Sequence, residues 1–150
     1  PLRQHPLLRA LRPDKLTLLA LTATLELYRD GRSAEIPTVA MLAADGASLR
    51  ARAESLQALC SAAGLAVEIL PTRSAVGGGA MPLVEPASWA GSPCCDAAQA
   101  RRMEVALRQG SAESAVVARL AGDRLLCDVR TVSEGELPAL AQALVAARGA

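Results

Sequence analysis

The chain has 150 residues, of which 16 are basic and 15 acidic, so its formal net charge at pH 7 is +1. This balance lacks the excess of Lys and Arg that nucleic-acid-binding domains carry, and the only aromatic side chains, Tyr28 and Trp89, are too few to stack single-stranded bases. The uncharged stretches 16–25 and 74–84 are shorter than the roughly 20 apolar residues that span a bilayer. Composition therefore predicts a soluble cytoplasmic protein with no membrane partner.

The potential metal ligands are widely separated. The sequence has four cysteines and one histidine, His5, and it contains no Cys-x-x-Cys pair. Structural zinc sites need closely spaced pairs of ligands, so we expect no metal site. Cys60 and Cys127 lie in apolar patterns and are predicted to be core residues, whereas Cys94 and Cys95 are neighbours in a predicted loop.

The beginning of the chain is basic. Arg9 and Arg12 lie three residues apart between Pro6 and Pro13, and the first acidic residue is Asp14. On one helical turn the two arginine side chains point in the same direction. Guanidinium groups bind phosphate-like oxyanions through paired N–H donors. The arginine pair is therefore a candidate anion site, and a solvated basic turn is the alternative interpretation.

A long helix is predicted next. Asp14 is typical of an N-cap and Gly31 of the residue after a helix C-terminus, which predicts a helix over residues 15–30. The apolar residues of this helix lie on two nearly opposite faces, a pattern typical of a helix buried between two bodies. The faces consist of Leu16, Ala20, Ala23 and Leu27, and of Leu18, Leu21, Leu25 and Tyr28. We therefore expect the helix to join two domains.

Two helices and a strand are predicted to follow. A short helix begins near Pro37, and a longer one runs from Ser48 to Gly64. The longer helix has apolar residues at helical spacing: Leu49, Ala53, Leu56, Cys60 and Ala63. Alternating apolar residues over 65–69 predict a half-buried strand that ends at Pro71.

Gly77, Gly78 and Gly79 form the least ordinary local sequence. Three successive glycines permit either a sharp change of chain direction or a close approach of the backbone to a ligand. Phosphate-binding loops usually lead directly into a helix or carry a lysine, and neither feature is present here. The turn is the favoured interpretation.

A strand and a helix are predicted after the glycines. The strand covers residues 83–89 and is cut short by Gly91-Ser92-Pro93. Asp96 and Gln99 resemble a capping box for a helix that ends at Gly110.

A hairpin and a last helix complete the predicted fold. Gly122-Asp123 predicts a tight turn between strands over 114–120 and 125–129. Arg119 and Asp128 then face solvent as a diagonal pair. Ser133 and Glu136 offer a second capping box before the last helix, whose apolar stripe is Leu137, Leu140, Ala141, Leu144 and Val145. The order of elements indicates an α+β fold, a small mixed or antiparallel sheet with helices on one face.

Three stretches resemble one protein family. They are His5-Pro6-Leu7-Leu8-Arg9-Ala10-Leu11-Arg12-Pro13-Asp14-Lys15-Leu16-Thr17-Leu18, Ser74-Ala75-Val76-Gly77-Gly78-Gly79-Ala80-Met81-Pro82, and Leu125-Leu126-Cys127-Asp128-Val129-Arg130-Thr131-Val132 preceded by Val116-Val117-Ala118-Arg119. In this order they resemble the segment after the cofactor lysine, the C-terminal glycine loop and the closing hairpin of the bacterial selenocysteine synthases, the L-seryl-tRNA(Sec) selenium transferases.

This resemblance implies a homo-oligomeric pyridoxal 5'-phosphate enzyme of the aspartate-aminotransferase fold type. Such an enzyme converts seryl-tRNA(Sec) to selenocysteyl-tRNA(Sec) with selenophosphate. The chain would be its C-terminal portion, with a substrate-arginine segment and inter-domain helix over residues 1–31 and a C-terminal α+β domain over 32–150. The tRNA would be bound mainly by parts outside this chain.

The resemblance also implies roles for particular residues. Arg9 and Arg12 match the family's arginine pair that contacts the phosphate-like substrate, and the glycines at 77–79 match a loop near that site. Asp14-Lys15-Leu16 resembles the sequence around the family's cofactor lysine. The next residues are Thr17-Leu18-Leu19 instead of Leu-Gly-Gly-Pro. The cofactor lysine is therefore expected upstream, and this chain alone is expected to be inactive.

The chain departs from the family pattern at two places, and two other functions remain open. Pro13 stands where the family has an aliphatic residue, and residues 91–95 interrupt a strand that is normally longer. A related pyridoxal-phosphate lyase acting on a small phosphorylated amino acid would keep the arginines and lose tRNA binding. A non-catalytic oligomerisation domain would need neither property.

Overall fold

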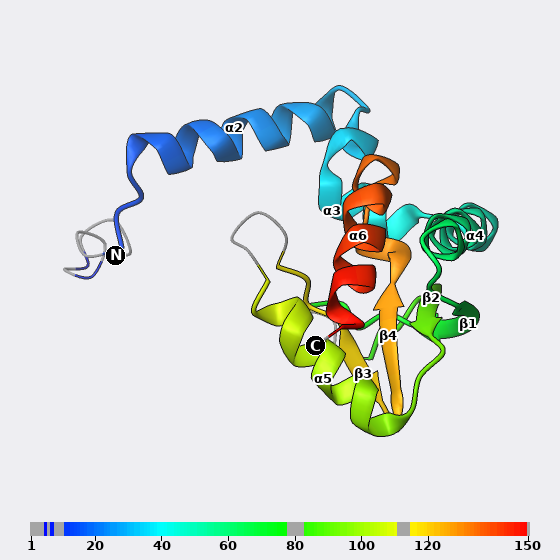
Figure 1. The fold of residues 1–150 in the computed structure, drawn as a ribbon. Helices are drawn as coiled ribbons and strands as arrows, with labels where there is room; N and C mark the ends of the chain where they lie inside the picture. Colours follow the sequence, from blue (N-terminus) through cyan, green and yellow to red (C-terminus); the bar gives the residue numbers. More distant parts are fainter. Residues whose placement is uncertain (1–4, 6, 8–10, 78–82, 111–114, 150) are drawn as a thin grey trace. The chain divides into compact units, whose positions relative to one another are not determined.

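The computed structural model describes residues 5, 7, 11–77, 83–110 and 115–149. The chain divides into two compact units, Pro1–Ala43 and Ala44–Ala150, and each is described by itself (Figure 1). None of the helices in the described ranges combines the length and apolar character needed to span a membrane.

The first unit contains α2 (Lys15–Arg29), the short 3-10 helix η2 (Ser33–Glu35) and α3 (Pro37–Ala43). The Asp14 carboxylate caps α2 by accepting hydrogen bonds from the backbone N–H groups of Leu16 (2.8 Å) and Thr17 (2.9 Å). Gly31 follows the helix with φ +69°, a conformation that glycine adopts without strain. The predicted long helix and its two terminal signals are confirmed.

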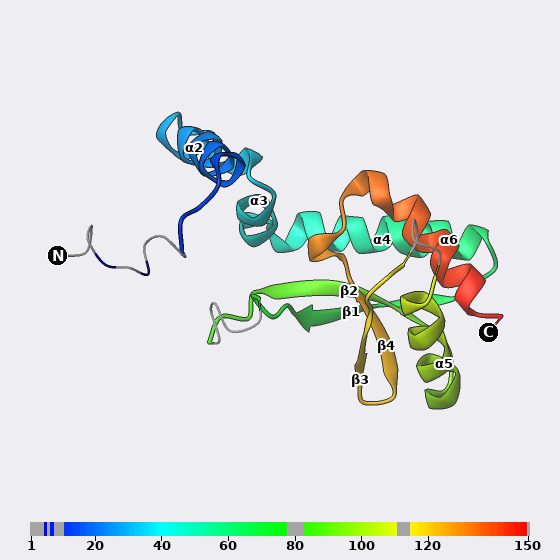
Figure 2. The same cartoon turned by 90° about the vertical axis from the view of Figure 1, so that its left-hand side faces the viewer.

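The second unit is a four-stranded sheet with three α-helices. Its strands lie in the order β1-β2-β4-β3, and every neighbouring pair is antiparallel (Figure 2). This arrangement confirms the predicted α+β fold. The elements are α4 (Gly46–Ala62), β1 (Val67–Arg73), β2 (Ala87–Pro93), α5 (Ala97–Arg108), β3 (Arg119–Ala121), β4 (Arg124–Asp128), η3 (Val129–Thr131), η4 (Glu134–Glu136) and α6 (Leu137–Ala147).

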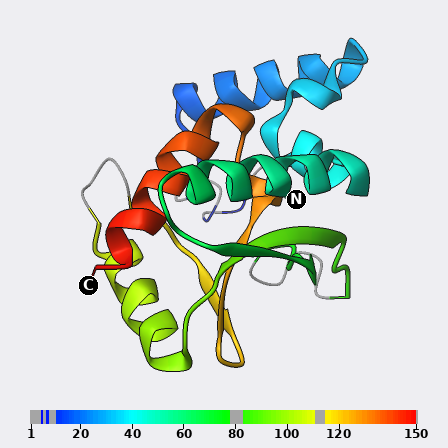
Figure 3. The same cartoon turned by 45° about the vertical axis from the view of Figure 1, so that its right-hand side comes forward.

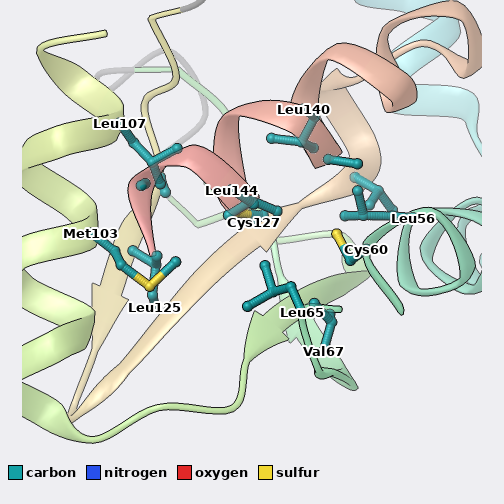
Figure 4. Close-up of a cluster of buried hydrophobic side chains, with 14 of the residues drawn as sticks. Leu56, Cys60, Leu65, Val67, Met103, Leu107, Leu125, Cys127, Leu140 and Leu144 are labelled. Atoms are coloured by element: carbon teal, nitrogen blue, oxygen red, sulfur yellow. The ribbon is translucent and has the colours of Figure 1, made fainter. Parts of the chain in front are cut away.

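A single apolar core joins the helices of this unit to the sheet. Helix α4 packs on β1 and β2, α5 packs on β3 and β4, and α6 packs on the other two helices (Figure 3). Figure 4 shows side chains from all three helices meeting those of β1 and β4. The labelled residues are Leu56, Cys60, Leu65, Val67, Met103, Leu107, Leu125, Cys127, Leu140 and Leu144. Cys60 and Cys127 are buried, as predicted.

The predicted end of β2 is wrong. The strand runs through Gly91-Ser92-Pro93 to its end and lies in the interior of the sheet, between β1 and β4. Gly91 belongs in the strand because helix α4 approaches closely there. A Cβ at Gly91 would lie 3.0 Å from Leu56 Cδ2 and 3.2 Å from Val67 Cγ1. The glycine therefore marks a close contact between helix and sheet, not a break.

The predicted end of β1 is also wrong, since the strand continues past Pro71 to Arg73. β1 is an edge strand, and an edge strand tolerates a proline because one side of its backbone has no partner strand.

The hairpin forms about the predicted turn, with Gly122 at φ +59° and Leu120 opposite Leu125. β3 begins only at Arg119, and the predicted start of that strand at Ser114 lies outside the described residues. The predicted diagonal pair is wrong. The Arg119 guanidinium donates to the Thr72 hydroxyl and to the Arg73 carbonyl (2.9 Å), and Asp128 accepts hydrogen bonds from other donors.

The two predicted capping boxes differ. Asp96 caps α5 by accepting from the Gln99 N–H (2.8 Å), but the Gln99 side chain donates to the Arg148 carbonyl instead of returning to the cap. Glu136 accepts from both the N–H and the hydroxyl of Ser133 (2.8 and 2.6 Å), and both halves of the second box are present.

We expect Gly91→Ala to lower the free energy of unfolding by about 1 kcal/mol, because overpacking costs about 1–3 kcal/mol and the lost freedom of glycine offsets part of that. Gly46→Ala is the matched control, since a Cβ there meets nothing within 4 Å. Urea unfolding of both variants measures the difference. Equal stability of Gly91→Ala and the unmodified chain would show that the close contact does not constrain the packing of α4.

Helix α2 should promote self-association of the isolated chain. None of its residues is buried, and Leu18, Leu21 and Leu25 are about half exposed. Each such side chain contributes about 1.5–3 kcal/mol when it is fully buried. Sedimentation should show oligomers that Leu18→Lys with Leu21→Lys abolishes. A monomer with strong hydrogen-exchange protection over residues 16–28 would contradict this expectation.

Candidate functional site

The structure describes only one of the two predicted substrate arginines. Arg9 lies outside the described residues, so its place beside Arg12 stays a prediction. Arg12 is exposed, in non-helical backbone two residues before the cap of α2. Among the described residues no carboxylate forms an ion pair with Arg12.

The acid nearest to Arg12 in sequence is engaged elsewhere. Both carboxylate oxygens of Asp14 accept hydrogen bonds from α2, one of them from the Thr17 hydroxyl (3.0 Å). Hydrogen bonds from the Thr17 backbone and hydroxyl hold the pKa of the Asp14 carboxyl below its ordinary value of 3.8. Asp14 therefore stays ionised as a helix cap at neutral pH, and the Arg12 guanidinium remains available to an anion.

His5 is described next to the arginine segment. Its Nδ1 accepts a hydrogen bond from the Leu7 N–H at 3.2 Å, and the Leu11 N–H donates to the Leu7 carbonyl at 2.9 Å. The imidazole thus contacts the backbone of its own turn, which fits an entry to a helical turn better than contact with an anion.

The chain offers little to a metal or to pyridoxal phosphate within the described ranges. No cluster of three potential metal ligands occurs there. Burial raises the pKa of the Cys127 thiol to about 12, so this thiol is neutral at physiological pH. Lys15, the only lysine in the sequence, is exposed at the first position of α2. A covalently held cofactor ring needs a walled pocket around its lysine, and an exposed helix start does not fit that need.

The glycine segment, which we define as residues 74–86, is described except for residues 78–82. Gly77 has φ +64°, so this position requires glycine, while Gly78 and Gly79 lie outside the described residues. Where the segment begins and ends, the Ser74 N–H donates to the Pro86 carbonyl at 3.0 Å. This hydrogen bond extends the β1–β2 ladder by one step beyond the last registered pair, Arg73 and Ala87.

Sequence reasoning missed a polar group at the same place, which we call the Asp128 cluster: Asp128, Ser74, Ser88 and Arg130. The hydroxyls of Ser74 and Ser88 donate to the two carboxylate oxygens of Asp128 at 2.5 and 2.6 Å. The Arg130 N–H donates to the same carboxylate at 3.0 Å. The two serines and Arg130 are buried, and Asp128 is half-buried.

The Arg130 side chain extends the cluster to two further segments. Its guanidinium donates to the carbonyls of Ala87 (2.6 Å) at the start of β2 and of Ala44 (3.3 Å) just before α4. From α4, Arg52 donates to the carbonyls of Val129 (3.2 Å) and Val132 (2.9 Å) on either side of Arg130. The short helix η3 is thereby held between β2 and α4. Only the register that pairs Ala90 with Asp128 could have revealed this cluster, because it brings Ser88 diagonally next to Asp128.

Comparison with known proteins gives a consistent result. A protein-family profile described as L-seryl-tRNA selenium transferase matches residues 1–133. Proteins named L-seryl-tRNA(Sec) selenium transferase are 44% identical in Geobacter metallireducens, 45% in Moorella thermoacetica and 35% in Aquifex aeolicus. These alignments cover 96%, 95% and 95% of the chain but 32%, 31% and 31% of the relatives. The chain therefore spans about a third of the length of these relatives.

The exposure of Lys15 generates a testable expectation. Adding pyridoxal phosphate to the isolated chain should produce no absorbance band that depends on this lysine, because Lys15 is exposed at the first position of α2. Absorbance spectra of the chain and of Lys15→Ala should therefore coincide. A saturable band that disappears in Lys15→Ala would contradict the expectation.

Proposed function

This chain belongs to the L-seryl-tRNA selenium transferase family, and we propose that it forms the C-terminal part of an enzyme that converts seryl-tRNA(Sec) to selenocysteyl-tRNA(Sec) with selenophosphate. The observation that carries the proposal is similarity along nearly the whole chain to proteins of that name. Arg12 supports it, because its exposed guanidinium has no carboxylate partner among the described residues.

In this proposal Arg9 and Arg12 bind the phosphate group of selenophosphate. A guanidinium donates two parallel N–H groups to two oxygens of one phosphate, which fixes the orientation of the substrate as well as its position. The positive charges also stabilise the negative charge that develops as the phosphate group leaves. A lysine would keep the charge and lose the paired geometry.

The cofactor belongs elsewhere in the proposed enzyme. Pyridoxal phosphate would supply the stabilisation of carbanionic charge on the seryl group. The exposed position of Lys15 supports a cofactor site outside this chain. The part of the enzyme outside this chain therefore has to hold the cofactor, and this chain contributes substrate binding.

The remaining features of the proposal concern organisation. Residues 1–31 provide the arginine segment and a helix that joins domains, and residues 32–150 form the C-terminal domain. The full-length enzyme is a cytoplasmic homo-oligomer that binds the tRNA mainly through its other parts. The exposed apolar side chains of α2, such as Leu16 and Leu19, support a helix that another part of the protein covers.

The test uses the full-length protein that contains this chain, assayed for selenium transfer from selenophosphate to seryl-tRNA(Sec). Arg9→Ala and Arg12→Ala should each lower kcat/KM roughly ten- to a hundredfold, because one hydrogen bond to a charged group contributes about 1.5–3 kcal/mol. Arg12→Lys should restore part of the loss. Thermal midpoints should stay nearly unchanged, since no buried acid loses its partner.

Arg32→Ala is the matched control. Arg32 is also an exposed arginine of the first unit, but its guanidinium pairs with Glu35 at 2.6 and 2.8 Å. Its replacement should leave transfer unchanged. Normal turnover of Arg12→Ala at limiting selenophosphate would refute the anion site, and an unmodified enzyme without transfer activity would refute the proposed function.

A further inference from the structure

Helix α5 presents a basic face to solvent, although the net charge of the whole chain is only +1. The helix contains three arginines, Arg101, Arg102 and Arg108, and one acid, Glu104. Its apolar residues are buried against the β3–β4 hairpin and α6 (Figure 3), and the arginines are exposed on the opposite side. The positive charge of the second unit is therefore locally concentrated on this helix.

Two acids approach this face, and they pair with it unequally. The Glu104 side chain is only 18% exposed, and it accepts hydrogen bonds from two nitrogens of the Arg108 guanidinium. Asp123, in the turn of the hairpin, lies 3.8 Å from Arg101, and the two side chains are 76% and 70% exposed. An ion pair so long and so exposed contributes little. Arg108 is thus neutralised, while the Arg101 guanidinium remains accessible to another anion.

The exposed side of α5 also carries a shallow hollow, which we call the α5 hollow. Its lining residues are Arg101, Arg102, Val105, Ala106 and Gln109. They recur three, four and seven residues apart, so they form neighbouring rows along one side of the helix. At 1.5 Å per residue, the two arginines lie roughly 10–12 Å from Gln109 along the helix axis. The α5 hollow is therefore cationic at one end and carries an amide at the other, with the 48% exposed Val105 between them.

These groups match the parts of an RNA backbone. Guanidiniums bind phosphate oxygens through paired N–H donors. The Gln109 amide both donates and accepts hydrogen bonds, as a ribose 2′-hydroxyl does. Because double-helical RNA is recognised by its shape and through phosphate and 2′-hydroxyl contacts, a shallow helix face is sufficient to bind it. A membrane-binding helix needs a broad apolar face, whereas Val105 is the only large apolar side chain that α5 exposes.

We propose that the α5 hollow binds a double-helical segment of the tRNA substrate. The inference rests on the proposed function, in which seryl-tRNA(Sec) is the substrate, and it adds a contact from this chain to those made by other parts of the enzyme. Arg101 and Arg102 bind phosphate groups, and Gln109 contacts a ribose hydroxyl. The contact is to the RNA backbone, so it contributes affinity without reading the base sequence.

The experiment measures the affinity of the full-length protein for a tRNA(Sec) transcript without serine, at several salt concentrations. Arg101→Ala with Arg102→Ala should weaken binding about tenfold at low salt. The slope of log K against log salt should become shallower by about one to two, because two phosphate contacts are lost. Thermal midpoints should stay nearly unchanged, since both side chains are exposed.

Two further variants test the parts of the α5 hollow separately. Arg101→Lys with Arg102→Lys keeps both charges, so it should retain most of the salt dependence while losing part of the affinity. Gln109→Ala also keeps both charges and should weaken binding about threefold without changing the slope. These variants cover the case in which the double alanine variant does not fold. Full affinity in both of them would overturn the site.

Arg32→Ala with Arg50→Ala is the matched control. It removes the same two positive charges, but each of these exposed arginines pairs with an acid of its own segment, Glu35 or Glu54. Transcript affinity should stay nearly unchanged in this variant. A loss equal to that of the Arg101 and Arg102 variant would reduce the effect to net charge and overturn the site.

Selenium transfer separates this inference from the proposed function. An active enzyme whose Arg101→Ala with Arg102→Ala variant binds the transcript normally would overturn the RNA site alone and favour an acidic protein as the partner of α5. A protein without transfer activity whose transcript affinity still depends on these arginines would refute the proposed function alone. Equal affinity for RNA and DNA duplexes of the same length would overturn the contact to a 2′-hydroxyl, and with it the assignment of RNA.

Discussion

The second unit depends on the close contact between α4 and the sheet at Gly91. Leu56 is fully buried and lies where a side chain at position 91 would have to go. Because this contact sets the distance between helix and sheet, it also places Val67 of β1 in the core beside Leu56. Interiors pack at the density of organic crystals, so one such contact constrains its neighbours throughout the apolar cluster.

The two faces of the sheet therefore make different kinds of contact. Trp89 and Gly91 alternate with Ser88 and Ala90 along β2, so the helices cover one face while Ser88 meets Asp128 from the other. Hydrogen bonds to Asp128 are directional, and they link the end of β1, the start of β2 and the end of β4.

The arginines of the described residues also differ in whether a partner lies nearby. Most arginines of the described residues have a nearby partner: Arg32 pairs with Glu35, Arg124 with Glu68, and Arg52 with two carbonyls of the η3 segment. Arg12 differs because its neighbouring acid caps a helix. An exposed guanidinium whose neighbouring carboxylate caps a helix keeps its N–H donors available to a phosphate-like anion. This contrast supports the proposal that substrate binds at the start of the chain.

Local sequence by itself determined the helices, the hairpin turn and the family. Asp14 and Gly31 bound α2 through bonds to their own neighbours, and Gly122 determines its turn, so no distant residue is needed. Tertiary structure decided what depends on distant partners. The sequence around Gly91 predicts a strand break, but the strand continues there because Leu56 packs against it. The sequence likewise predicts a solvated Asp128, but the register of β2 and β4 brings Ser88 to it. The candidate arginines could be predicted because an acid-free pair is a local property. The Asp128 cluster exists only in the folded sheet, where the Ser74 hydroxyl donates to a carboxylate 54 positions away.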